Sequence, residues 1–232
     1  ENSIDKFHGV SKFNITTGEQ IKTKSNLPSY TKVFANTLVK HAEKDSKIIG
    51  ITAAMPSGTG MDLFSEKFPA RMFDVGIAEQ NTLGVAAGLA NEGLNVFVST
   101  FAPFQTMRCL EQIKINLAYM QIPITFVGLA SGLSLGHLGY SHCCIEDLGV
   151  LRSLPNIKII SPSDTLETAK AVFAASESKE PIYIRLSGDN ASEAINFNDY
   201  NFQIGKAIQL IKGEKIALLA TGASVGESKK AA

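Results

Sequence analysis

The fold is decided by the sequence Arg71-Met-Phe-Asp-Val-Gly-Ile-Ala-Glu-Gln80. Its apolar start, residues 72–75, has the composition of a strand, and Gly76 permits a turn that a Cβ would hinder. From Ala78 onward the apolar residues recur at helical spacing, namely Leu83, Ala86, Ala87 and Ala90. Gly93 stands where the C-terminal cap of that helix is expected. The pattern therefore predicts a parallel-type strand followed directly by a helix.

Glu79 is the most informative residue of this stretch because it falls in the first turn of the predicted helix. In open α/β sheets, ligands bind outside the carboxyl ends of the strands. A carboxylate in a first helical turn is also stabilised by the helix dipole. The residues alone leave two interpretations open: Glu79 contacts a ligand, or it only caps the helix.

Length and composition suit one α/β domain, or one domain and a fragment of a second. The chain has 232 residues, of which 44% are hydrophobic, and it carries no net charge. This balance argues against nucleic acid or a strongly anionic membrane as a partner. No apolar run reaches the roughly 18 residues of a membrane-spanning helix, and the polar N-terminus lacks a signal-peptide core. Because the first residue is not Met, we expect a piece of a longer protein.

Histidine and cysteine gather at His137, His142, Cys143 and Cys144, so a metal site must be considered. A second spaced pair of ligands is missing, and adjacent cysteines make a poor tetrahedral chelate. We therefore expect no metal ion held by these residues. With Cys109 the cysteines are odd in number, which favours free thiols in a reducing compartment and predicts a cytoplasmic protein.

The remaining elements follow from periodicity and capping signals. We expect helices at 29–43, 61–68, 111–119, 145–156 and 165–176, and strands at 48–52, 95–100, 123–130, 157–161, 181–186, 205–211 and 215–221. Ser29 and Asp164 are the predicted N-caps of two of these helices. Residues 53–60 are expected to form a loop of small residues that admits a ligand close to the backbone. Alternating strands and helices predict a parallel sheet with helices on both faces.

Two groups of side chains at predicted carboxyl ends could bind a ligand. Phe101, Phe104 and Met107 are spaced by three, so they share one face and offer flat contact area to a heterocycle. The alternative is ordinary core packing. Arg185 presents a planar fork suited to phosphate, and its alternative is a surface ion pair.

The motif Asp74-Val-Gly-Ile-Ala-Glu-Gln80 resembles the signature of the pyrimidine-binding domain in the transketolase family of thiamine diphosphate enzymes. The resemblance implies the thiamine diphosphate-binding fold and gives Glu79 a catalytic role. In the family this Glu hydrogen-bonds N1′ of the aminopyrimidine and promotes its imino tautomer. The resemblance further implies that the ring packs on Phe104, with Phe101 and Met107 on the same platform.

Substrate-binding residues are implied in the same way. The loop Gly132-Leu-Ser-Leu-Gly-His-Leu-Gly-Tyr-Ser-His142 resembles a family loop with the pattern Gly-x-Asp-Gly-x-Thr-His-Gln, which places His142 at the catalytic histidine. Leu138 replaces the family Asp, which contacts a substrate hydroxyl, and Cys143 replaces the Gln. By position, Ser57, Arg108 and Arg185 match residues that hold the substrate phosphate. For Ser57 a plain turn with a helix cap at Thr59 is the alternative.

The resemblance divides along the chain. Residues 7–80 are similar to 1-deoxy-D-xylulose 5-phosphate synthase, whereas residues 101–156 are closer to transketolases, especially those split into two chains. The first expectation is therefore the synthase, which condenses pyruvate with glyceraldehyde 3-phosphate for isoprenoid precursor and thiamine biosynthesis. Transketolase, or the C-terminal subunit of a split transketolase, is the alternative. A non-catalytic, interface-forming domain is a second alternative.

The resemblance also implies a domain plan and partners. We expect a linker or arm at 1–28, the pyrimidine-binding domain at 29–190, a linker at 191–210 and the truncated start of the family's C-terminal domain at 211–232. The family binds Mg²⁺ and the cofactor diphosphate on another domain, whose Gly-Asp-Gly signature is absent from this sequence. We therefore expect a partner domain or subunit, a homodimer, a small phosphosugar or 2-oxo acid substrate, and no activity from this chain alone.

Overall fold

The fold is taken from a computed structural model that describes residues 12–21, 27–188 and 200–232. Its strands are β1 (Ile48–Thr52), β2 (Met72–Asp74), β3 (Asn95–Phe101), β4 (Ile124–Ser131), β5 (Lys158–Ile160) and β6 (Ile182–Ser187). Its α-helices are α1 (Tyr30–Ala42), α2 (Pro56–Thr59), α3 (Met61–Lys67), α4 (Glu79–Asn91), α5 (Ala102–Thr106), α6 (Leu110–Gln112), α7 (Asp147–Leu151), α8 (Thr165–Ser176) and α9 (Ser224–Ala231). Short 3₁₀ segments are η2 (Pro69–Arg71), η4 (Gly136–Leu138) and η5 (Tyr140–His142), and η3 (Ile113–Tyr119) is a π-helix.

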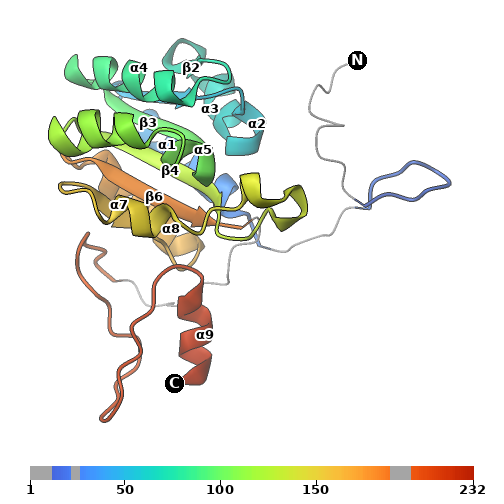
Figure 1. The fold of residues 1–232 in the computed structure, drawn as a ribbon, viewed down its shortest axis with the longest axis vertical. Coiled ribbons are helices and arrows are strands. Elements are labelled where there is room, and N and C mark those ends of the chain that lie inside the picture. Colours follow the sequence, from blue (N-terminus) through green and yellow to red (C-terminus); the bar gives the residue numbers. More distant parts are fainter. Residues whose placement is uncertain (1–11, 22–26, 189–199) are drawn as a thin grey trace.

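The strands form one parallel sheet in the order β2-β1-β3-β4-β6-β5 (Figure 1). From β1 the chain moves outward to β2 and then returns to the other side of β1 to form β3. Such a reversal opens a crevice at the carboxyl ends of the strands, where ligands bind in open α/β sheets. The predicted fold class, a parallel sheet between helices, is confirmed.

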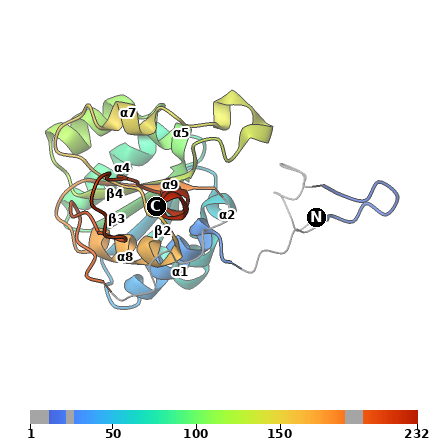
Figure 2. The same cartoon turned by 90° about the horizontal axis from the view of Figure 1, so that it is seen from below.

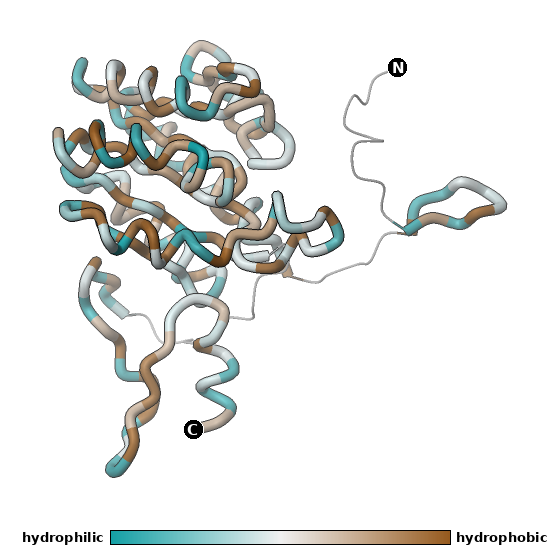
Figure 3. Tube along the Cα trace, viewed as in Figure 1, coloured by the Kyte–Doolittle hydropathy of each residue, from teal (hydrophilic) through white to brown (hydrophobic). Residues whose placement is uncertain are grey.

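Helices cover both faces of the sheet (Figure 2). On one face α1, α3 and α8 pack through side chains that include Phe34, Leu38 and Phe64. On the other face α4, η3 and α7 pack through a second buried cluster that includes Leu83 and Leu117. Hydrophobic residues, coloured brown in Figure 3, are frequent along the strands that lie between these helical layers. Burial of these two clusters supplies the main driving force for the fold.

Capping signals proved reliable. Ser29 accepts a hydrogen bond from the Lys32 amide at the start of α1, and Asp164 accepts one from the Glu167 amide, 2.8 Å away, at the start of α8. Gly93 follows α4 with a φ of +81°, a backbone conformation that glycine adopts without strain. The predicted N-caps Ser29 and Asp164 and the predicted glycine at the C-terminal end of α4 are therefore confirmed.

Three segments differ from expectation in detail. The loop expected at 53–60 contains the helical turn α2, because Pro56 fits the first position of a helix. The helix expected at 145–156 is reduced to α7 (Asp147–Leu151). The helix expected at 111–119 divides into α6 and the π-helix η3, whose wider turns are closed by a bond from the Met120 amide to the Ile115 carbonyl, 2.9 Å long. Both helix types bury the same apolar residues, so periodicity did not separate them.

The strands predicted at 205–211 and 215–221 are wrong. Both segments are irregular, and no described strand lies beside them to accept their backbone hydrogen bonds. Ile216 and Leu219 are 84% and 94% exposed, so their apolar pattern is not used for packing here.

Of the expected linkers, residues 1–11, 22–26 and 191–199 lie outside the described residues. Across the described residues, every helix is too short or too polar to cross a membrane.

Candidate active site

Asp74 fixes the backbone frame of the site. Its Oδ1 accepts hydrogen bonds from the Gly76 amide at 3.0 Å and from the Ala54 amide at 2.7 Å. Ala54 has a φ of +55°, which is unfavourable for a residue with a Cβ, so this bond stabilises a strained turn. One carboxylate thus ties the segment after β1 to the segment after β2. The sequence pattern alone assigned Asp74 no separate role, although an Asp two residues before a Gly is a known turn signal.

Glu79 is the first residue of α4 and is 4% exposed. Arg108 Nη1 donates to Glu79 Oε1 over 2.5 Å. The adjacent Gln80 donates from Nε2 to the backbone carbonyl of Arg108, 2.9 Å away. The start of α4 is therefore held to the segment after α5 by two neighbouring side chains, and the buried carboxylate has a charged partner.

Phe104, on α5, is the centre of an aromatic group. The Arg108 guanidinium lies over its ring, with Cζ 4.3 Å from the centroid. The Phe101 ring is 6.1 Å away between centroids, and the His142 ring is 5.3 Å away in an edge-on arrangement. With Glu79, these four residues form one contiguous group at the carboxyl ends of the strands, which we call the Glu79 cluster.

The other predicted site residues lie around or beyond this cluster. Ser57 is exposed on α2, and a Cβ on the next residue, Gly58, would lie 3.8 Å from the Phe101 ring. Met107 is 43% exposed and Leu138 is 40% exposed. The turn carrying Ser57 therefore borders the cluster, whereas Met107 is largely turned to the outside.

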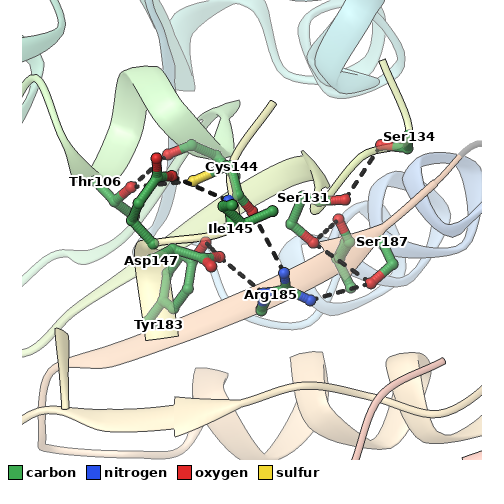
Figure 4. A network of polar contacts seen from close by, with 12 residues as sticks. Thr106, Ser131, Ser134, Cys144, Ile145, Asp147, Tyr183, Arg185 and Ser187 are labelled. Atoms are coloured by element: carbon green, nitrogen blue, oxygen red, sulfur yellow. Dashed lines mark hydrogen bonds and ion pairs between the residues drawn. The ribbon is translucent and has the colours of Figure 1, made fainter. Parts of the chain in front are cut away.

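Arg185 lies in a separate buried network (Figure 4). Its Nε donates to Asp147 Oδ2 over 2.8 Å, and the Tyr183 hydroxyl donates to the same oxygen over 2.9 Å. Asp147 is fully buried, and burial raises the pKa of Tyr183 well above its ordinary value, with the Asp147 charge adding to the effect. Among the described residues, Asp147 Oδ1 has no hydrogen-bond partner. The sequence pattern showed Asp147 only as part of a predicted helix and gave no sign of its buried partners.

This network also anchors the loop that carries His142. Gly132 and Cys144 exchange backbone hydrogen bonds of 2.7 and 2.8 Å, which close the base of the loop. Arg185 Nη2 donates to the Cys144 carbonyl at 3.5 Å, and Nη1 donates to Ser187 Oγ at 3.3 Å. Arg185 is therefore a clamp between β6 and the loop, with Nε, Nη1 and Nη2 each engaged.

In residues 12–21, 27–188 and 200–232 there is no group of three or more His, Cys, Asp or Glu side chains placed to hold a metal ion. An open hollow of about 1130 Å³ lies between the start of α8, residues 206–221 and α9. None of the predicted site residues lines this hollow.

Comparison with known proteins decides the family. The family described as "Transketolase, pyrimidine binding domain" matches residues 27–192, which is most of the chain. The chain belongs to the transketolase pyrimidine-binding domain family. This family is one of thiamine diphosphate-dependent transferases, and the Glu79 cluster lies within the matched residues.

Solved transketolases agree with this assignment. A split gene transketolase, described as an inactive β4 tetramer, is 32% identical with a TM-score of 0.79, covering 89% of this chain and 66% of that chain. Transketolase from Leishmania mexicana is 23% identical with a TM-score of 0.66, covering 73% of this chain and 27% of that one. Transketolase from Campylobacter jejuni subsp. jejuni NCTC 11168 is also 23% identical with a TM-score of 0.66, covering 77% of this chain and 29% of that one. The last two support the fold, and the chain spans under a third of their length.

The residues of the cluster fit the aminopyrimidine half of thiamine diphosphate. Glu79 offers a buried carboxylate, and Phe104 offers an aromatic face. One flat group, the Arg108 guanidinium, already contacts both, so their spacing suits a planar ring with hydrogen-bonding atoms on its edge.

The three cysteines should differ sharply in reactivity. Burial raises the pKa of Cys109 to about 12, with the Glu79 charge adding to the effect, and burial raises the pKa of Cys144 to about 11. Only thiolates react, so we expect one fast thiol per chain, Cys143, with Ellman's reagent at about pH 8. All three should react after denaturation, and Cys143→Ser should remove the fast phase. Two or more fast thiols in the native chain would contradict the structure around Cys109 and Cys144.

Proposed function

We propose that this chain is the pyrimidine-binding part of a thiamine diphosphate-dependent transferase of the split transketolase type. The observation that carries the proposal is the burial of the Glu79 carboxylate at the start of α4, in one cluster with Phe104. The similarity to a split gene transketolase over 89% of the chain supports it. Diphosphate and Mg²⁺ are then held by a separate domain or subunit. Since that relative is described as an inactive β4 tetramer, we infer that this chain alone is also inactive and self-associates.

Each residue of the cluster has a defined task in this proposal. When bound, the cofactor supplies a nucleophilic carbon for attack on a substrate carbonyl. Glu79 holds the ring nitrogen and exchanges a proton with it, and Phe104 packs on the ring face. His142, whose ring meets the edge of Phe104, exchanges protons with the substrate.

The substrate phosphate is the expected ligand of Ser57, Arg108 and Arg185. Ser57 is exposed beside Phe101, as such a role requires. Arg185 binds Asp147 through Nε and makes longer contacts through Nη1 and Nη2, so a phosphate at the base of the His142 loop would replace the two longer contacts. Arg108 is engaged with Glu79, so it reaches a phosphate only after leaving that contact.

Leu138 favours a second candidate, 1-deoxy-D-xylulose 5-phosphate synthase. In the loop that carries His142, the family has an Asp that contacts a substrate hydroxyl. This chain has Leu138 at that position, and it is 40% exposed. A polar group left unpaired costs about 1–3 kcal/mol when it is buried. Pyruvate lacks the hydroxyl of ketol donors, so it would avoid this penalty. The acceptor in this candidate is glyceraldehyde 3-phosphate.

Glu79→Gln in the assembled enzyme tests the proposed function. Gln keeps the shape and hydrogen-bonding capacity of the side chain but cannot exchange a proton with the ring. We expect C2–H exchange of the bound cofactor, followed by NMR in deuterated buffer, to slow by about 100-fold or more. Glu92→Gln, the same substitution at an exposed position at the other end of α4, is the control and should exchange at the wild-type rate. An unchanged rate in Glu79→Gln would mean that Glu79 only holds Arg108 at the start of α4.

Donor choice separates the two candidates. If Leu138 excludes the donor hydroxyl, the assembled enzyme should use pyruvate with a higher kcat/KM than hydroxypyruvate. Leu138→Asp should then shift the preference toward hydroxypyruvate by about tenfold, which corresponds to one recovered hydrogen bond. Leu138→Asn provides a neutral polar control. A wild-type preference for the ketol donor would favour transketolase and rule out the synthase.

A further inference from the structure

Arg108 makes both of the contacts that the proposed function reserves for the cofactor ring. Its Nη1 donates to Glu79 over 2.5 Å, and its guanidinium plane carries Cζ 4.3 Å from the Phe104 centroid. A guanidinium is flat, has N–H groups on its edge and stacks on aromatic faces. An aminopyrimidine shares these three properties. Within the chain, Arg108 therefore stands where a planar, hydrogen-bonding ring would stand.

The surroundings of Arg108 allow its side chain to leave without disturbing the backbone. The Arg108 side chain is 46% exposed, whereas that of Glu79 is 5% exposed. The Arg108 carbonyl is held by Gln80, so the backbone stays anchored to α4. Arg108 also lies between α5 and α6, outside both helices. Only side-chain torsions need to change, and the long arginine chain has several of them.

Arg108 can leave Glu79 only when another group replaces it. Removing the cation would leave the buried Glu79 carboxylate without a charged partner, which is strongly unfavourable. An incoming group displaces Arg108 only if it binds Glu79 in turn and covers the Phe104 face. A planar ring with a nitrogen on its edge does both, whereas water or a simple anion does not.

We propose, on the basis of the function proposed above, that Arg108 is a displaceable internal occupant of the pyrimidine site. It keeps Glu79 and Phe104 in their binding arrangement while the cofactor is absent. Binding is then an exchange of one flat group for another, and the competition by Arg108 lowers the affinity of the site for the ring. Once displaced, the cation is free to turn toward the substrate phosphate.

The probe for the test is 4-amino-5-hydroxymethyl-2-methylpyrimidine, the free pyrimidine portion of thiamine. In chain labelled with ¹³C,¹⁵N-arginine, the probe should shift the Arg108 side-chain signals and leave those of the exposed Arg152 unchanged. Arg108→Gln, whose neutral amide competes for Glu79 more weakly than a guanidinium does, should bind the probe about tenfold more tightly. Arg152→Ala, with the same loss of charge, should keep the wild-type affinity.

The outcomes separate this inference from the proposed function. If wild type and Arg108→Gln bind the probe equally while Glu79→Gln abolishes binding, the pyrimidine site stands and Arg108 is not its occupant. If no variant binds the probe, the pyrimidine site fails and this inference fails with it. Circular dichroism checks the fold of Arg108→Gln. Should that variant not fold, the labelled wild-type chain decides, and unmoved Arg108 signals at saturating probe overturn the inference.

Discussion

The ion pair between Glu79 and Arg108 is the interaction on which the rest of the site depends. Glu79 is buried at the start of α4, where the helix dipole favours its negative charge but burial opposes it. The guanidinium supplies the missing partner and extends over Phe104. The start of α4 and the segment after α5 are thereby held at one distance. That distance sets the width of the proposed ring site.

A second arginine, Arg185 on β6, likewise holds two parts of the site together. Arg185 pairs with the fully buried Asp147 and reaches the Cys144 carbonyl, so it fixes the loop that brings His142 against Phe104. In the proposed function, Arg108 organises the cofactor side of the Glu79 cluster and Arg185 organises the substrate side. Both are charges held by buried carboxylates, which gives the site rigidity before any ligand binds. Preorganisation of this kind is what transfer enzymes require of the groups around the reacting atoms.

Much of the fold was predictable because apolar residues recur with one spacing in strands and another in helices. The strand–turn–helix around Gly76, the Ser29 cap and the parallel sheet follow from local chemistry and were confirmed. The grouping of Glu79, Phe104 and His142 followed from the family resemblance. The partners of Arg108 and Arg185 did not follow, because a sequence shows that a cation is present but not which carboxylate it faces. The strands expected at 205–211 and 215–221 failed for a related reason: a strand exists only where another backbone pairs with it, and no local pattern reveals that.

The most direct test of the central claim is a double-mutant cycle on the stability of the chain, with Glu79→Gln, Arg108→Gln and the double variant unfolded in urea. If the ion pair organises the site, Arg108→Gln should cost much more in the wild-type background than in the Glu79→Gln background. The expected coupling is about 1–3 kcal/mol, below that of a fully buried pair because Arg108 is half-exposed. Effects that add to within about 0.5 kcal/mol would contradict the account, since the two side chains would then act independently.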